Sequence, residues 1–246
     1  MARASTLRIL CVNVRKSCRK RIAVVRSISI ETNAVILPGF VDVPDGARGM
    51  VLFAHGSGSS RLSPRNNYVA QALRDAHVGT LLFDLLTAQE ERIDEETRDL
   101  RFDIALLTRR LVAATHWAQT RPELSHLALG YFGASTGAAA ALCAAACTPA
   151  VRAVVSRGGR PDLAGPALAE VRAPTLLIVG GDDQQVLALN RRALAQLPCE
   201  GRLEIVPGAT HLFEEPGALE KVASLAAKWF VRHLASPERS RVPANA

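Results

Sequence analysis

The sequence predicts an α/β fold with a mostly parallel, twisted sheet of about eight strands and helices on both faces. Three observations support this prediction. Short apolar runs recur along the chain, segments with helical spacing of apolar residues lie between them, and glycine- or proline-containing stretches separate the two kinds of segment. Strands that alternate with helices form parallel sheets through right-handed crossovers. A chain of 246 residues, 48% of them hydrophobic, can bury a core of this size.

The first two expected strands form an antiparallel pair. β-branched residues are frequent over residues 22–30 and 34–43, and Glu31-Thr-Asn33 supplies the turn between them. Continuous apolar runs follow, which indicate strands buried on both faces. These runs cover residues 49–54, 79–83, 151–156, 174–180 and 201–206, together with a run that begins at Leu127.

Helical spacing of apolar residues fills the intervals between these strands. The expected helices cover residues 67–76, 100–117, the alanine-rich segment after Ser135, and residues 163–170, 186–197 and 217–234. The acidic stretch over residues 90–99 is interpreted either as a rim of the site or as the exposed start of a helix. The interval between Ser156 and Thr175 is short, so no large cap domain is expected.

We expect one domain over residues 22–235, a flexible basic N-terminal extension over residues 1–21 and a frayed C-terminal tail over residues 236–246. The formal net charge is +7, but eight arginines and lysines precede Glu31 in a stretch with no acid. The basicity therefore belongs to the extension, which is interpreted as a solvated segment, a targeting segment or a contact for nucleic acid or lipid. No nucleic-acid partner is expected for the domain, and no apolar run is long enough to span a bilayer.

The sequence predicts no metal and no cofactor. Its five cysteines include no C-x-x-C pair and no zinc-like spacing with histidine, which favours a reducing compartment and a cytoplasmic location. Gly56-x-Gly58 lacks the third glycine of a dinucleotide loop, and neither a phosphate-binding lysine motif nor H-E-x-x-H occurs.

The segment from Leu127 to Leu142 predicts a strand, a tight turn and a helix around Ser135. Gly133-Ala-Ser-Thr-Gly137 has the G-x-S-x-G form of a nucleophile elbow, in which small neighbours let the strand and the helix approach each other. A serine hydroxyl needs a histidine as a base, and the histidine needs a carboxylate to orient it. Both are expected later in the chain, in the order acid and then histidine.

Two loops that follow expected strands supply these groups. Gly180-Gly-Asp-Asp contains the adjacent acids Asp182 and Asp183, and Gly208-Ala-Thr-His contains His211. The carboxyl ends of parallel strands meet at one edge of a sheet, so these loops are expected to lie near Ser135.

Together these motifs resemble the α/β-hydrolase superfamily. From about residue 22 to residue 234 the chain is similar to dienelactone-hydrolase-like small bacterial hydrolases, a type also found fused to phosphoribosyltransferase domains. The motifs that carry the resemblance are His55-Gly-Ser-Gly-Ser-Ser, Phe83-Asp-Leu-Leu-Thr, Gly133-Ala-Ser-Thr-Gly, Ser156-Arg-Gly-Gly-Arg-Pro-Asp-Leu-Ala-Gly, Gly180-Gly-Asp-Asp and Gly208-Ala-Thr-His-Leu-Phe.

The resemblance implies an α/β-hydrolase fold and a role for each site residue. It makes Ser135 the nucleophile, His211 the general base and Asp183 the acid, with Asp182 as the alternative acid. It also assigns the two oxyanion donors to the backbone amides of Ser57 and Thr136. True dienelactone hydrolases use a cysteine nucleophile, so the serine in this chain implies a serine esterase or a related acyl hydrolase.

The expected partner is therefore a small ester-like substrate, cleaved through an acyl-enzyme. His55, Arg157 and Arg160 are candidates for contacts with it; the arginines are interpreted as facing an anionic substrate or as lying in a solvated loop. The alternatives are a thioesterase, lactonase or acyltransferase on the same fold, or a catalytically idle hydrolase fold that binds a partner. The sequence allows a homo-oligomer without requiring one.

Overall fold

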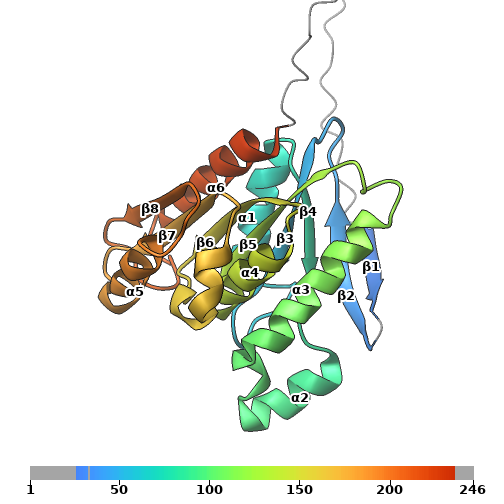
Figure 1. Cartoon of the computed structure of the whole chain (residues 1–246), viewed down its shortest axis with the longest axis horizontal. Helices are drawn as coiled ribbons and strands as arrows, with labels where there is room; N and C mark the ends of the chain where they lie inside the picture. The colour runs from blue at the N-terminus through green and yellow to red at the C-terminus, as the bar shows by residue number, and fades with distance from the viewer. Residues whose placement is uncertain (1–25, 33, 236–246) are drawn as a thin grey trace, which may run out of the picture.

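A single eight-stranded sheet runs through the protein (Figure 1). The computed structural model describes residues 26–32 and 34–235, so the expected extension and tail lie outside the described residues. The strand order is β1-β2-β4-β3-β5-β6-β7-β8. Only the pairs β1–β2 and β2–β4 are antiparallel, which confirms the predicted mostly parallel sheet. The strands are β1(Arg26–Glu31), β2(Ile36–Asp42), β3(Gly49–Ala54), β4(Gly79–Phe83), β5(Ala128–Ala134), β6(Val151–Arg157), β7(Thr175–Gly180) and β8(Gly201–Val206).

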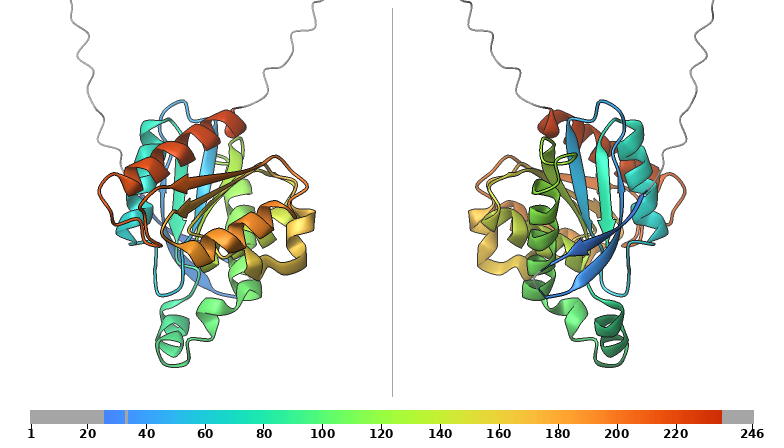
Figure 2. Two further views of the ribbon diagram at one scale, coloured as in Figure 1. Left: turned by 90° about the vertical axis from the view of Figure 1, so that its left-hand side faces the viewer. Right: turned by 90° about the vertical axis from the view of Figure 1, so that its right-hand side faces the viewer.

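Helices cover both faces of the sheet, as predicted (Figure 2). α1(Pro64–Asp75) and α6(Ala218–Leu234) pack against each other on one face. α3(Ile104–Gln119), α4(Thr136–Cys147) and α5(Gln184–Leu194) belong to the opposite face. α4 is almost entirely buried, which explains why its sequence is alanine-rich on every side.

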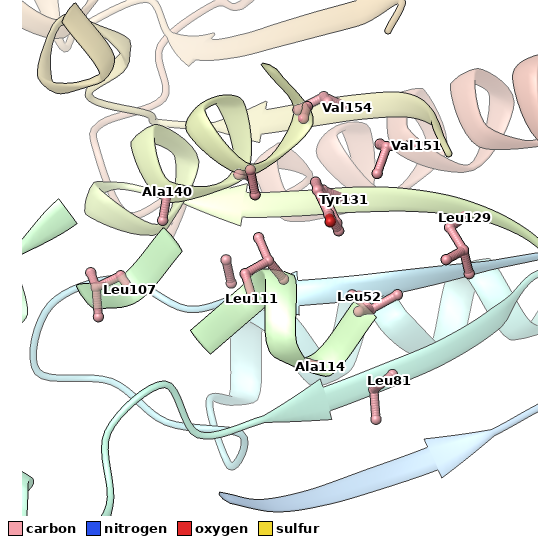
Figure 3. Close-up of a cluster of buried hydrophobic side chains, with 14 of the residues drawn as sticks. Leu52, Leu81, Leu107, Leu111, Ala114, Leu129, Tyr131, Ala140, Val151 and Val154 are labelled. Atoms are coloured by element: carbon pink, nitrogen blue, oxygen red, sulfur yellow. The ribbon is translucent and has the colours of Figure 1, made fainter. Parts of the chain in front are cut away.

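The two faces of the sheet fill two separate parts of the core. In β3, Leu52 contributes to the cluster under α3 and α4, whereas its neighbour Phe53 contributes to the cluster under α1 and α6. Tyr131 and Phe132 divide in the same way, and Figure 3 shows Tyr131 among the side chains of the first cluster. Because both faces are covered, these strands read as continuous apolar runs rather than alternating ones.

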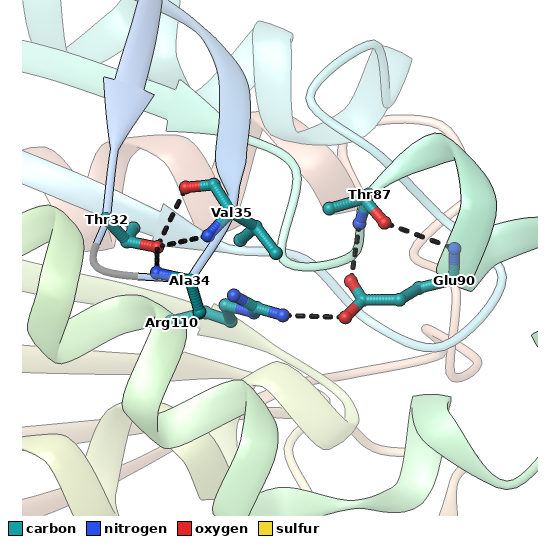
Figure 4. Close-up of polar contacts among 6 residues, drawn as sticks. All are labelled: Thr32, Ala34, Val35, Thr87, Glu90 and Arg110. Atoms are coloured by element: carbon teal, nitrogen blue, oxygen red, sulfur yellow. Dashed lines mark hydrogen bonds and ion pairs between the residues drawn. The ribbon is translucent and has the colours of Figure 1, made fainter.

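The acidic stretch forms a helix of its own, α2(Ala88–Thr97), which projects from the body of the protein (Figure 2). A capping box starts it: Thr87 Oγ1 accepts the N–H of Glu90 at 3.1 Å, and the Glu90 carboxylate accepts the N–H of Thr87 at 2.8 Å. Arg110 of α3 pairs with the same carboxylate at 2.6 Å (Figure 4). The last turn before α3 is a short 3₁₀ helix, η1(Leu100–Phe102), so α3 begins later than predicted.

Between β6 and β7 the chain forms only η2(Pro161–Glu170), which confirms that no large cap domain is inserted there. The helix predicted over residues 163–170 lies within η2, which is made of 3₁₀ turns interrupted at Gly165. Gly165 has φ 53° and Pro166 follows it. A left-handed residue followed by a proline prevents a continuous α-helix.

Candidate active site

Ser135 lies on a sharp turn between β5 and α4, with φ 52° and ψ −120°. This backbone conformation is rare for a residue with a side chain and is typical of a strained functional turn. A Cβ on Gly133 would come within 2.4 Å of Ala138 Cα, and a Cβ on Gly137 within 2.2 Å of the Ala54 carbonyl oxygen. The two glycines of the motif are therefore required by close packing, as the sequence predicts.

The end of β6 fixes the elbow from the other side. The Ser135 N–H donates to the Arg157 carbonyl at 3.2 Å, and the Arg160 N–H donates to the Ser135 carbonyl at 3.1 Å. The backbone of Ser135 is thus held at both its amide and its carbonyl, which leaves the side chain to be presented by the turn.

The loop after β3 brings Ser57 next to the start of α4. Gly56 lies directly against the elbow, since a Cβ there would be 3.1 Å from Ser135 Cβ. Thr136 is the first residue of α4, so its N–H has no acceptor within the helix. Ser57 and Thr136 line one cavity, and Ser57 also lines the cavity that contains Ser135.

His55 holds this loop in place. Its Nε2 accepts the N–H of Leu85 at 3.0 Å, so Nδ1 carries the proton and donates to the Gly56 carbonyl at 3.0 Å. Burial lowers the pKa of His55 below its ordinary value, which favours this neutral form. Both ring nitrogens are used by backbone groups, so His55 has neither one available for a substrate.

The structure brings Asp183 to His211 and leaves Asp182 exposed. Asp183 Oδ2 lies 2.7 Å from His211 Nδ1, and Asp183 Oδ1 accepts the N–H of Val186 at 3.4 Å at the start of α5. The two loops are joined by a backbone bond of 3.0 Å from the Asp182 N–H to the Ala209 carbonyl. The Asp183 side chain is 14% exposed and that of His211 39%, so the acid lies behind the imidazole.

Ser135, His211 and Ser57 meet at a cavity of about 210 Å³. Arg157 and Arg65 line the same cavity. A second cavity of about 180 Å³ lies on the other side of the 55–60 loop, where Leu86, Leu107 and residues of α2 form its wall. The acidic stretch is therefore both a helix and a rim of the site, so the two interpretations of the sequence are compatible.

The two arginines proposed from the sequence have different surroundings. Arg157 is 8% exposed and lines the Ser135 cavity. Arg160 makes two bonds to Asp162, of 2.9 and 2.7 Å, and the pairing raises the pKa of Arg160 and lowers that of Asp162. The charge of Arg160 is thus paired with the carboxylate of Asp162. Arg160 is not among the residues that line the Ser135 cavity.

The sequence reasoning missed Arg65 and the start of α2 at Ala88. α1 begins at Pro64 rather than at residue 67, which puts Arg65 in its first turn. The start of α1 could have been predicted from Ser63-Pro64, because a serine N-cap followed by proline is typical of a helix start. The start of α2 could have been predicted from the capping-box pattern Thr87-x-x-Glu90.

Within residues 26–32 and 34–235, no group of three or more histidine, cysteine or acidic side chains is placed to hold a metal ion. No helix in the described part of the chain is long and apolar enough to cross a membrane.

Comparisons with known proteins agree with this fold. The model of the dienelactone hydrolase family matches residues 68–234. A dienelactone hydrolase from Anabaena variabilis has 59% identity and a TM-score of 0.85, covering 87% of this chain and 99% of that one. An esterase from Pyrococcus furiosus shares the fold at 16% identity, with a TM-score of 0.67 and coverage of 87% and 92%.

Two curated Mycobacterium tuberculosis proteins, each named "Putative phosphoribosyl transferase", are 58% identical over 211 residues. The match covers 85% of this chain and 47% of each relative, so the chain spans about half the length of these relatives. The family match and the similarity to the Anabaena protein lead to one conclusion: the chain has the α/β-hydrolase fold and belongs to the dienelactone hydrolase family.

Proposed function

We propose that the protein is a serine hydrolase that cleaves an ester-like bond of a small molecule through an acyl-enzyme. The observation that carries this proposal is the convergence of a strained serine elbow and a histidine–aspartate pair on one cavity. Ser135 has φ 52°, His211 Nδ1 lies 2.7 Å from Asp183 Oδ2, and Ser135 and His211 line the same cavity.

In the proposed mechanism, His211 Nε2 takes the proton of the Ser135 hydroxyl as Oγ attacks the substrate carbonyl carbon. Asp183 accepts a hydrogen bond from the Nδ1–H of His211, which fixes the tautomer and stabilises the imidazolium. The amides of Ser57 and Thr136 stabilise the tetrahedral oxyanion, and His55 keeps the loop of Ser57 in position. The leaving alcohol takes the proton from His211, and water then resolves the acyl-enzyme through the same base.

The test is hydrolysis of a short-chain activated ester such as para-nitrophenyl acetate. We expect Ser135→Ala and His211→Ala each to lower kcat by on the order of a thousandfold or more, with unchanged circular dichroism and melting temperature. Wild-type turnover in either folded variant would exclude the assignment.

Labelling with a serine-directed phosphonate tests the nucleophile directly. We expect one adduct on Ser135, located by peptide mass spectrometry, and none in Ser135→Ala. If folded wild-type protein forms no adduct and hydrolyses no ester, thioester or lactone, a hydrolase fold used only for binding becomes the better account.

A further inference from the structure

The guanidinium of Arg157 is a buried cation without a carboxylate partner among the described residues. The residue is 8% exposed, and its Nε and Nη1 atoms make no hydrogen bond within the described part of the chain. Its Nη2 donates to Asn66 Oδ1 at 3.4 Å, which is a long bond to a neutral group. Buried charges in proteins are normally paired and hydrogen-bonded, because an isolated ion in the interior is strongly destabilising.

Arg157 nevertheless remains a cation at neutral pH. Burial, together with the nearby charge of Arg65, lowers the pKa of Arg157 to about 10. The like charge of Arg65 destabilises the unpaired guanidinium of Arg157 further, so a negative charge bound between them would be more strongly stabilised. The described residues do not supply one to Arg157, so an anion in the adjacent cavity would satisfy it.

The other groups around this part of the cavity also suit an anion. The first turn of α1 contains Arg65 and no acidic residue. The N-cap residue Ser63 lines the cavity. The N-terminus of a helix carries a partial positive charge. Arg65 does contact Glu214 at 3.2 Å, but the two side chains are 36% and 64% exposed, so this pair is screened by water.

The position of His211 indicates which half of the substrate would lie here. A leaving alcohol receives its proton from the histidine, so it must lie beside that ring. His211, Arg157 and Arg65 line one cavity. The second cavity is lined by Ser57, Thr136, Leu86 and Leu107 and by four acidic residues, but by neither Ser135 nor His211; the acidic residues are Asp84, Glu91, Asp94 and Glu95. These carboxylates disfavour an anion there. This second cavity is the better place for a small acyl group.

We propose that Arg157, Arg65 and the N-terminus of α1 form a subsite for an anionic group on the alcohol half of the substrate. This inference rests on the proposed esterase function and specifies the substrate class of that site. Carboxylate and phosphate share the required chemistry, since both accept charge-assisted bonds from guanidinium groups. The substrate class is thus a short-chain acyl ester of an alcohol that carries a carboxylate or a phosphate.

Matched acetates of one phenol scaffold test the subsite. We expect kcat/KM for para-acetoxybenzoate or para-acetoxyphenyl phosphate to exceed that for neutral methyl para-acetoxybenzoate by about ten- to a hundredfold, mainly through KM. The better of the two anionic substrates identifies the group that the subsite binds. Moving the charge to the acyl half, in mono-para-nitrophenyl glutarate compared with para-nitrophenyl butyrate, should give no such advantage.

Arg157→Gln should remove the preference for the anionic acetates while the neutral acetate is still hydrolysed. Arg160→Gln is the matched control, because this arginine lies on the same loop but is paired with Asp162, and it should keep the full preference. An equal rate on anionic and neutral acetates in the wild type, or a preference that survives Arg157→Gln, would overturn the subsite while leaving the proposed esterase intact.

Thermal melting gives a readout that does not depend on turnover. Removing an unpaired buried cation should leave the melting temperature of Arg157→Gln equal to or above that of the wild type, whereas removing a structural cation would lower it. Inorganic phosphate at millimolar concentration should raise the melting temperature of the wild type and of Arg160→Gln, but not that of Arg157→Gln. A lower melting temperature for Arg157→Gln together with equal phosphate effects on all three proteins would show that Arg157 is structural.

Discussion

At the scale of single residues, close packing around Ser135 and the two oxygens of Asp183 restrict which residues these positions of the site can hold. The Ser135 turn requires glycine at position 137, because a Cβ there would overlap the Ala54 and His55 carbonyl oxygens at 2.2 and 2.4 Å. Asp183 uses one carboxylate oxygen for the His211 ring and the other for the first turn of α5. One side chain therefore connects the orientation of the histidine to the position of a helix.

This double role predicts different results for two adjacent acids. Asp183→Asn should lower kcat by on the order of 10⁴, because an amide can donate to Nδ1 and so stabilise the wrong tautomer. Asp182→Asn should retain nearly all activity, since the Asp182 side chain is exposed. Steady-state kinetics with a short activated ester would measure both variants. A larger loss for Asp182→Asn than for Asp183→Asn would contradict the assignment of the acid.

The sequence predicted Ser135 and His211 because each follows an apolar run in a short glycine-containing motif. The resemblance to a known pattern ranked Asp183 above Asp182. Which of two adjacent acids contacts His211 depends on the directions of their side chains, which the sequence does not give. The state of Arg157 was not predictable either. Whether an arginine at the end of a strand is solvated or buried without a partner depends on α1, which lies about ninety residues earlier in the chain.

At the scale of elements, α2 connects the periphery of the protein to the site. Its residues Glu91 and Glu95 form part of the wall of the cavity that contains Ser57. Glu90 bonds to the N-cap residue Thr87 at the start of α2 and joins the helix to Arg110 of α3 (Figure 4). Asp94 fixes the other end by its ion pair with Arg101 at 2.5 Å.

Glu90→Ala should therefore loosen α2 selectively. The change removes the back-bond of the capping box and leaves Arg110, whose side chain is 10% exposed, without its carboxylate. We expect a loss of about 1 to 2 kcal/mol in the free energy of unfolding and faster hydrogen exchange of the α2 amides. Glu90→Gln should keep the cap and show a smaller effect.

Glu96→Ala is the control, because Glu96 is an exposed residue of the same helix. A change within about 0.5 kcal/mol is expected for it. Equal exchange rates in Glu90→Ala and Glu96→Ala would mean that packing, not capping, holds α2.

At the scale of the whole molecule, the sheet order explains how distant motifs meet. β3, β5, β6 and β7 are consecutive neighbours and all parallel, so the loops after them emerge at the same edge. The parallel order could be predicted from the alternation of strands and helices. The two cavities that share the 55–60 loop could not be predicted from the sequence, because their walls depend on how α1 and α2 pack at the edge of the sheet.

Two histidines, one buried and one half-buried, give the whole protein a predictable acid response. Burial lowers the pKa of His55 and of His233, whose side chain is 11% exposed. Both groups therefore bind protons less readily in the folded protein than in the unfolded chain, where the pKa is about 6.5. Their contribution to stability is complete above pH 6.5 and is lost as the pH falls through their lower folded-state pKa values.

We therefore expect the free energy of unfolding, from urea titrations, to fall as the pH drops below about 6.5, the pKa of histidine in the unfolded chain. His55→Gln should make the decline shallower, because it removes one titrating group, and it should also slow ester hydrolysis by releasing the loop of Ser57. A decline equally steep in His55→Gln and wild type would mean that the pKa of His55 is the same in the folded protein as in the unfolded chain. The bond from the Leu85 N–H would then not favour the neutral ring, and the loop of Ser57 would need another anchor.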